Sequence, residues 1–304
     1  MSRLLLHAVL ISTAFAATVR ADSVVLTPVA DSTLIELMPD NNMGGHVFFN
    51  VGSTFHGVRN RGMLRFDVAA GIPVGSKIKS VQLVVEVVGI PVEPPSGANF
   101  RLHRVLRPWG EGDKISVGGP GRGDTATIGE VTWNHRHALT VDEWGAPGGL
   151  AGMDFSPAMS GERFMEPSDN LAYEFGSSSQ MVADVQMWLD EPASNYGWLL
   201  KAEDEETRTT ARRFASREDL EYGPQLLLEF DPPPLLELTR NVSELRVSFL
   251  ALANKSYVFE TASLLNAPSW TSLTNIYPST EERTIQITNV IGATTGFFRV
   301  VVGE

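Results

Sequence analysis

The chain has 304 residues, no cysteine, and 36 acidic against 24 basic side chains, so its formal net charge is −12. Hydrophobic residues make up 43% and charged residues 20% of the chain, a globular composition that excludes intrinsic disorder. The acidic balance argues against nucleic-acid binding and against docking on anionic lipid, because both need a basic surface. The absence of cysteine excludes disulfides, cysteine-zinc sites and thiol nucleophiles.

The first 21 residues have the pattern of a signal peptide. Arg3 precedes an apolar run over residues 4–19, and Val19, Arg20 and Ala21 offer a cleavage site before Asp22. Cleavage there removes two arginines and no acid, which takes the formal charge from −12 to −14. We therefore expect a secreted protein, extracellular or periplasmic, that does not insert in a membrane after cleavage. A chain without cysteine fits a bacterial envelope or exterior. The alternative is an uncleaved N-terminal anchor.

Short strands separated by Gly, Pro and Asn turns dominate the chain up to residue 231. The clearest case is the run over residues 81–87, where Val81, Leu83, Val85 and Val87 alternate with other residues and so share one face. Further strands are predicted at residues 23–26, 47–52, 63–68, 100–106, 196–201, 212–216 and 225–230. We predict an all-β fold, an antiparallel β-sandwich of jelly-roll type, over residues 22–231.

One helix and one long loop interrupt this series. Apolar residues recur at helical spacing between Met181 and Leu189, serines at 177–179 can cap the helix, and Pro192 ends it. The Gly- and Pro-rich stretch over residues 117–167 shows few regular patterns. Loops of this length are uncommon and often functional.

Residues 232–234 are three consecutive prolines and are predicted to form a linker. The following residues, 235–304, alternate apolar and polar side chains at 245–249, 257–260 and 284–287, and end in a Phe-Phe-Arg-Val-Val-Val run. They predict a second, small all-β sandwich domain of a size near the lower limit for independent folding.

A series of motifs in the first domain occurs in the order seen in a known family. Three of them are Trp109-Gly110-Glu111-Gly112, Thr132-Trp133-Asn134 and Phe214-Ala215-Ser216-Arg217-Glu218. The full set lies at residues 30–33, 49–52, 64–67, 72–78, 104–112, 131–134, 195–200, 214–218 and 224–226. Residues 30–230 thus resemble the DNRLRE domain family, secreted β-sandwiches grouped with carbohydrate-binding modules that include alginate binders. The C-terminal domain resembles small β-sandwich tails of exported bacterial proteins.

The resemblance implies a polysaccharide partner, and the residues offer candidates for the binding site. Sugar binding needs an aromatic face, and arginine pairs with uronate carboxylates. The candidates for carbohydrate contact are Trp109, Trp133, His135, Arg136, Arg208 and Arg213. Because alternate strand residues share a face, we expect Arg213 to point outward and Phe214 inward. The alternatives are that the tryptophans belong to the core and that the arginines balance the acidic run at residues 203–206.

No cofactor is required by any motif, but a structural calcium ion is one option. Asp31, Asp40 and Asn41 form the most oxygen-rich group, and hard cations prefer oxygen ligands. The alternative is that these residues only form turns before Gly44 and Gly45.

Taken together, the patterns favour an exported, non-catalytic, monomeric protein that binds a polysaccharide, with an acidic, uronate-containing glycan as the expected ligand. Two alternatives stay open. One is a lyase or hydrolase of acidic polysaccharide, for which His135, Arg136 and His137 have suitable side chains. The other is a purely structural envelope or matrix protein.

Overall fold

The computed structural model describes residues 22–93, 95–119, 121–240, 245–264, 269–288 and 297–303. The predicted signal peptide, residues 1–21, lies outside the described residues. Contacts divide the described chain into two compact units, one ending at Pro232 and the other beginning at Pro233. The division falls inside the run of three prolines. The two units are described separately.

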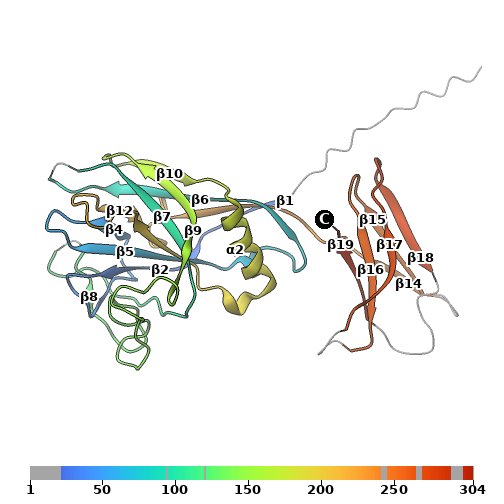
Figure 1. The fold of residues 1–304 in the computed structure, drawn as a ribbon, viewed down its shortest axis with the longest axis horizontal. Coiled ribbons are helices and arrows are strands. Elements are labelled where there is room, and N and C mark those ends of the chain that lie inside the picture. Colours follow the sequence, from blue (N-terminus) through green and yellow to red (C-terminus); the bar gives the residue numbers. More distant parts are fainter. Residues whose placement is uncertain are drawn as a thin grey trace, which may run out of the picture. The chain divides into compact units, whose positions relative to one another are not determined.

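The first unit is an antiparallel all-β structure, which confirms the predicted fold class (Figure 1). Its principal strands are β1 (Asp22–Leu26), β2 (Pro28–Ile35), β4 (Phe48–Ser53), β5 (Arg59–Phe66), β6 (Lys77–Gly89), β7 (Ala98–Val105), β9 (Phe155–Met165), β10 (Leu171–Phe175), β11 (Trp198–Ala202), β12 (Arg212–Ala215) and β13 (Gln225–Asp231). They follow the order β1-β13-β6-β12-β4-β5-β11-β7-β9, with β10 on β6 and β2 on β5. Two-residue strands β3 (Asn41–Asn42) and β8 (Asp124–Thr125) pair separately.

Strand β6 is the longest strand of the unit and shows why the sheet forms. The alternation predicted from the sequence is present, because Val81, Leu83, Val85 and Val87 are all buried. They join a core that contains Phe49 and Phe214 from β4 and β12. Strands β12 and β13 both pair with β6, so the strand carries neighbours along its whole length.

Helix α2 (Ser179–Asp190) lies against β6 and β9, within a residue or two of the predicted bounds. Ser178 caps it by accepting a hydrogen bond from the Met181 backbone amide. Beneath it, the fully buried Asp184 carboxylate accepts hydrogen bonds from Trp198 Nε1 (3.0 Å) and Gln180 Nε2 (2.9 Å) and pairs with Arg104. A single helical turn, α1 (Val68–Gly71), and a 3-10 turn at Pro192–Ser194 complete the helical structure described. None of the described helices is long and apolar enough to cross a membrane.

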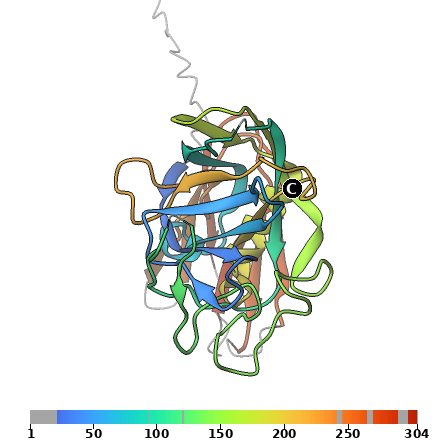
Figure 2. The ribbon, with the colours of Figure 1, turned by 90° about the vertical axis from the view of Figure 1, so that its left-hand side faces the viewer.

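A second apolar cluster lies under the long loops between β8 and β9, drawn in green (Figures 1 and 2). Trp109, Trp133 and Trp144 are its largest members, and Leu199 of β11 packs with them. Trp109 Nε1 donates to the Tyr196 carbonyl and Trp144 Nε1 donates to the Thr132 carbonyl. The loops are therefore held by tryptophans that point into the protein.

The second unit contains two three-stranded antiparallel sheets. One has the order β14 (Glu237–Arg240), β15 (Leu245–Ala251), β18 (Arg283–Thr288), and the other β17 (Thr271–Ile276), β16 (Tyr257–Ala262), β19 (Phe297–Val302). Its buried core includes Val247, Phe249, Tyr257 and Phe259. The small β-sandwich expected from the sequence is consistent with this arrangement of sheets.

Several strands were not predicted, because their residues lack the alternation of apolar and polar side chains that identifies a strand. Strand β2 contains Asp31, Ser32 and Thr33, which are polar yet buried, and β17 is polar and almost wholly exposed. Strand β9 includes Pro157 and Gly161, residues that usually weaken strands. Pairing with neighbours, which is a tertiary effect, overrides local preference in these segments.

Candidate functional site

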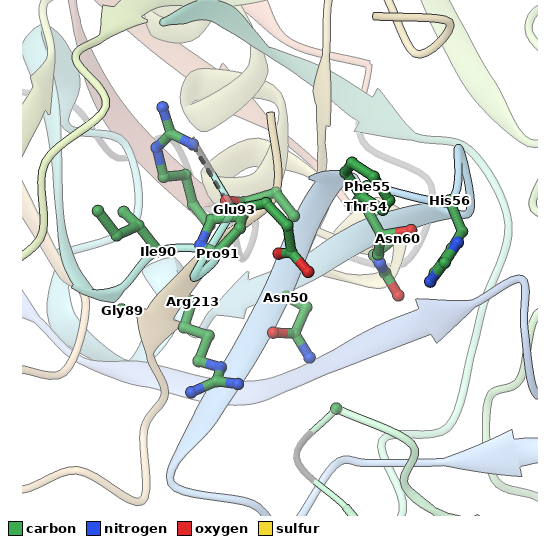
Figure 3. A pocket seen from close by; sticks show the side chains of 13 residues that line it. Asn50, Thr54, Phe55, His56, Asn60, Gly89, Ile90, Pro91, Glu93 and Arg213 are labelled. Carbon is green, nitrogen blue, oxygen red and sulfur yellow. Dashed lines mark hydrogen bonds between the residues drawn. The ribbon is translucent and has the colours of Figure 1, made fainter. Parts of the chain in front are cut away.

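A hollow of about 220 Å³ opens on the first unit where β4, β6 and β12 lie side by side (Figure 3). Residues with polar or aromatic side chains line it, among them Asn50, Phe55, His56, Asn60, Glu93 and Arg213. They come from three separate stretches of sequence, which the sheet order β6-β12-β4 brings together. The floor of the hollow is the outer face of this sheet.

Strand alternation decides which residues form the floor. In β12 the side chains of Arg212 and Phe214 are buried, whereas Arg213 is half-buried and lines the hollow. The same alternation in β4 buries Phe49 and Val51 in the core and leaves Asn50 at the hollow. Arg213 is the register partner of Asn50 on one side and of Gly89 on the other. The outward direction predicted for Arg213 is confirmed.

Turns and loops form the walls. The β4–β5 turn contributes Thr54, Phe55 and His56, and Phe55 is 49% exposed at the rim. The segment after β6 contributes Ile90, Pro91 and the exposed Glu93. Gly121, from the glycine-rich loop before β8, also lines the hollow and touches Asn50, since a methyl group built on it would lie 2.8 Å from Asn50 Nδ2.

Arginines without acidic partners gather at this hollow. Many arginines of the first unit are paired with carboxylates, as in Arg61 with Glu205 (2.7 Å) and Arg107 with Asp154 (3.1 Å), although Arg65, Arg122 and Arg163 have no such pair among the described residues. Arg213 has no such partner among the described residues, and its guanidinium lies 5.0 Å from the centre of the Phe48 ring. Arg208, also without a carboxylate partner in the described chain, lies against Gly57, the neighbour of His56.

Arg212, the first residue of β12, has a buried side chain and no carboxylate partner in the described chain. It is 1% exposed, and its guanidinium donates to the carbonyls of Thr210 (3.1 Å), Ala211 (3.0 Å), Ser96 (2.7 Å) and Glu166 (3.2 Å). Burial lowers the pKa of Arg212, although a guanidinium stays charged at neutral pH. Its positive charge is thus balanced by carbonyl dipoles only, close behind the floor of the hollow.

His46 does not line the hollow but is affected by the positive charge of Arg213. His46 packs edge-on against Phe48, with ring centres 4.3 Å apart. Burial, together with the positive charge of Arg213, lowers the pKa of His46. Both effects favour the neutral form of His46.

The predicted aromatic platform is wrong. Trp109 and Trp133 are each 3% exposed and belong to the second apolar cluster, so neither presents a ring face to a ligand. Arg59 and Arg61 also lie over the Trp133 ring, at 5.5 and 5.4 Å from its centre. The motifs that carry the two tryptophans mark core packing, which was the alternative interpretation.

The second predicted patch is also tied into the structure. Arg136 is 5% exposed, and its guanidinium donates to the Pro108 carbonyl (3.0 Å) and to the Asp142 carboxylate (2.9 Å). His135 lies 3.9 Å from Glu143. Neither residue lines the hollow. Of the six predicted carbohydrate contacts, Arg213 lines the hollow, Arg208 lies against Gly57 next to the lining residue His56, and the other four lie elsewhere.

The three residues proposed for calcium are not brought together as one site. Asp31 is 1% exposed and accepts from the Arg217 backbone amide (2.7 Å), whereas Asp40 accepts from Asn134 (2.9 Å). Asn41 donates its amide to the Arg122 carbonyl. Within the part of the chain that the structure describes, no three His, Cys, Asp or Glu side chains are grouped to hold a metal ion. Each of the three has a hydrogen-bonding role in a turn or strand.

Of the residues that line the hollow, only Arg213 was among the predicted contacts, and the missed ones include Asn50, Phe55, His56, Asn60 and Glu93. Two of these, Phe55 and His56, belong to one turn. The signal available for two of them was the short Thr-Phe-His-Gly turn between two strands, since an aromatic residue at a hairpin tip is exposed without a packing reason. Asn60 and Glu93 gave no such signal, because only the sheet order β6-β12-β4-β5 brings them to the same hollow.

No protein-family model matches this sequence, and a search of curated proteins found none with significant similarity to it. The site is therefore interpreted from its own geometry.

Proposed function

We propose that this chain is an exported, non-catalytic protein that binds an acidic polysaccharide at the hollow formed by β4, β6 and β12. The observation that carries the proposal is the grouping of Arg213 and Arg208, both without acidic partners among the described residues, in a protein of net charge −12. Charges more than about 10 Å away are screened at ordinary salt. A local positive patch can therefore attract a polyanion despite the acidic whole.

The chemistry of the lining suits a sugar that carries a carboxylate. Arginine forms charge-assisted hydrogen bonds to carboxylates. The amides of Asn50 and Asn60 can each donate to and accept from hydroxyl groups, and the exposed Phe55 ring can cover an apolar sugar face. The charged or titratable residues among the described lining are Arg213, Glu93, His56 and Arg212, and the Arg212 side chain is buried.

Membership of the DNRLRE family is part of this proposal. The motifs at residues 30–33, 49–52, 131–134 and 214–218 support it, and an antiparallel sandwich-like fold agrees with it. Export is the second part, supported by the apolar run that precedes Asp22. N-terminal sequencing of the secreted protein should begin at Asp22 or within a few residues of it. Recovery of intact Met1 from the cytosol would contradict export.

The deciding experiment is a glycan array on the mature protein, followed by titration calorimetry against alginate and a neutral glucan. We expect binding to uronate-containing glycans and none to the neutral glucan. Assays for new reducing ends and for unsaturated uronates, run on the same mixtures, test the lyase and hydrolase alternative. Cleavage would contradict the non-catalytic assignment. Absence of binding to every acidic glycan would favour a purely structural protein.

A further inference from the structure

We propose that the hollow binds a single sugar residue at the end of an acidic glycan chain, rather than several residues along the middle of a chain. This inference rests on the proposed function and specifies how the same site recognises its ligand. The mode of recognition decides how many copies of the protein one polysaccharide can hold.

The size of the hollow is the first argument. Pockets that hold drug-sized molecules measure roughly 300–1,000 Å³, whereas this hollow measures about 220 Å³. A site that contacts several linked sugars needs a longer trough than this. The hollow matches a ligand unit smaller than a drug-sized molecule, and the natural unit of that size in a polysaccharide is a single sugar residue.

The walls are the second argument, because they stand on three sides of the floor. Phe55 and His56 lie on the side of the β4–β5 turn, and Pro91 and Glu93 lie on the side of β6 (Figure 3). Gly121 bounds it from a third segment of the chain, against Asn50. A polysaccharide that continued in both directions would need two open sides in line with each other. A terminal residue needs only one.

The placement of the anion-binding groups is the third argument. Arg213 and Asn50 are register partners across β12 and β4, and each lies against a glycine, Gly89 and Gly121 respectively. A methyl group on Gly89 would lie 3.1 Å from Arg213 Cδ, so the arginine stem runs along the bare backbone of β6. Asn50 Nδ2 donates to Met43 Sδ (3.9 Å), so Arg213 is the principal anion-binding group on the floor, which fits one anionic group and not a row of them.

Glu93 disfavours a second charged sugar residue in the hollow. Its exposed carboxylate lines the hollow and forms no ion pair with Arg213 among the described contacts. A second ligand carboxylate beside it would be repelled, and like charges placed at contact are unfavourable. Hydroxyl groups, in contrast, can donate to Glu93. The side chain therefore favours a ligand with one anion at Arg213 and hydroxyl groups opposite.

Titration calorimetry with a purified short oligouronate and with long polyuronate, at equal molar concentrations of chains, tests this proposal. We expect one protein per chain and the same affinity per chain for both lengths, and we expect Arg213→Ala to lose affinity for both equally. The control variant Lys77→Ala, which removes an exposed cation at the far end of β6, should leave both titrations unchanged.

Two results would overturn the inference in different ways. Many proteins per long chain, with affinity per chain that rises with length, would show binding along the chain and would leave the proposed function intact. Absence of heat with either probe, while the protein melts cooperatively, would overturn the proposed function and this inference together. A sulfated oligosaccharide without uronate, titrated in the same way, tells whether the anion must be a carboxylate. Binding of that probe by one protein per chain supports end recognition of an anion in general.

Discussion

Arg212 and Arg213 are consecutive residues of β12, and their guanidinium groups lie on opposite faces of the strand. Arg212 donates to four backbone carbonyls on the inner side, whereas Arg213 lies over Phe48 and lines the hollow on the outer side. Successive side chains in a strand point to opposite faces, so one residue has a structural role and the other is available to a ligand. The two arginines should therefore respond differently to substitution.

Arg213→Ala should weaken binding of an acidic glycan about tenfold or more. A charge-assisted hydrogen bond contributes about 1.5–3 kcal/mol, and about 1.4 kcal/mol corresponds to tenfold in affinity. Loss of the Phe48 contact should cost at most about 1 kcal/mol of stability. Titration calorimetry and urea denaturation measure the two effects. Lys77→Ala is the matched control, since the strand from Lys77 to Gly89 spans roughly 40 Å. Equal affinity in wild type and Arg213→Ala would show that the glycan does not bind at the hollow.

Gly89→Leu should weaken glycan binding without a change in charge. A Cβ atom on Gly89 would lie 3.1 Å from Arg213 Cδ and 3.5 Å from its Cβ, so a leucine must displace the arginine stem that runs beside it. The arginine can move away from the strand because its side chain is flexible, and we expect the melting curve to stay cooperative. A smaller loss is expected for Gly89→Ala. Calorimetry on both variants should show this graded effect, and unchanged affinity in Gly89→Leu would contradict the floor geometry.

Asp184→Asn should destabilise the first unit by about 3 kcal/mol. The carboxylate lies on the buried face of α2 and pairs with Arg104 at 3.1 Å, so the substitution leaves a guanidinium without its anion. Asp190→Asn, on the exposed end of the same helix, is the control and should change stability by no more than about 0.5 kcal/mol. Urea midpoints measure both. Similar midpoints for the two variants would mean that the buried pair contributes little.

Asp31 should make stability fall as pH rises above the acidic range. Burial raises the pKa of Asp31 well above its usual value, against the opposing hydrogen bond from the Arg217 amide. The folded protein then holds a proton at pH values where the unfolded chain has lost it. The contribution is complete below the pKa of the unfolded aspartate and is lost as pH rises through the folded pKa.

Asp31→Asn cannot ionise and should gain stability relative to wild type as pH rises. Urea midpoints across a pH series measure this difference. Burial also raises the pKa of the neighbouring Glu111, so the decline should shrink in the variant without disappearing. Parallel pH profiles for wild type and variant would show that Asp31 is ionised in both the folded and the unfolded protein.

A chain shortened to end at Pro232 should fold by itself. The two apolar clusters of the first unit contain only residues before Asp231, and the cluster of the second unit contains only residues after Pro234. Circular dichroism should show strand-type signal, and thermal unfolding should be cooperative with the midpoint of the corresponding transition in the full chain. An unfolded product would mean that residues beyond Pro232 complete the first core.

The sequence predicted most of the strands of the first unit because their apolar residues alternate. The run over residues 81–87 is the best example, and it lies inside β6 (Lys77–Gly89) with Val81, Leu83, Val85 and Val87 buried. Strand β2 escaped because its buried face includes Asp31, Ser32 and Thr33, whose burial depends on partners that are distant in sequence, such as Arg217. Local patterns carry no information about such partners.

The site was predictable only in part, for the same reason. Alternation within β12 gave the direction of Arg213, which needs no knowledge of other strands. The tryptophans were misleading, because Trp133 is as suitable chemically for a sugar platform as for a core, and only the packing of the β8–β9 loops decides between them. Glu93 and Asn60 reach the hollow through strand order, which a single sequence does not specify.

The tryptophans have a practical consequence for spectroscopy. Trp188 and Trp198 lie in the first core with ring centres 4.6 Å apart, and Trp109, Trp133 and Trp144 lie in the second cluster of the same unit. Trp270 lies in the other unit beside Arg299, and the protein has six tryptophans in all. Intrinsic fluorescence will therefore follow unfolding of the first unit almost exclusively. Since no described residue that lines the hollow is a tryptophan, a bound glycan should change this emission very little. Thermal unfolding followed by fluorescence in the presence of ligand therefore measures stabilisation without interference from quenching.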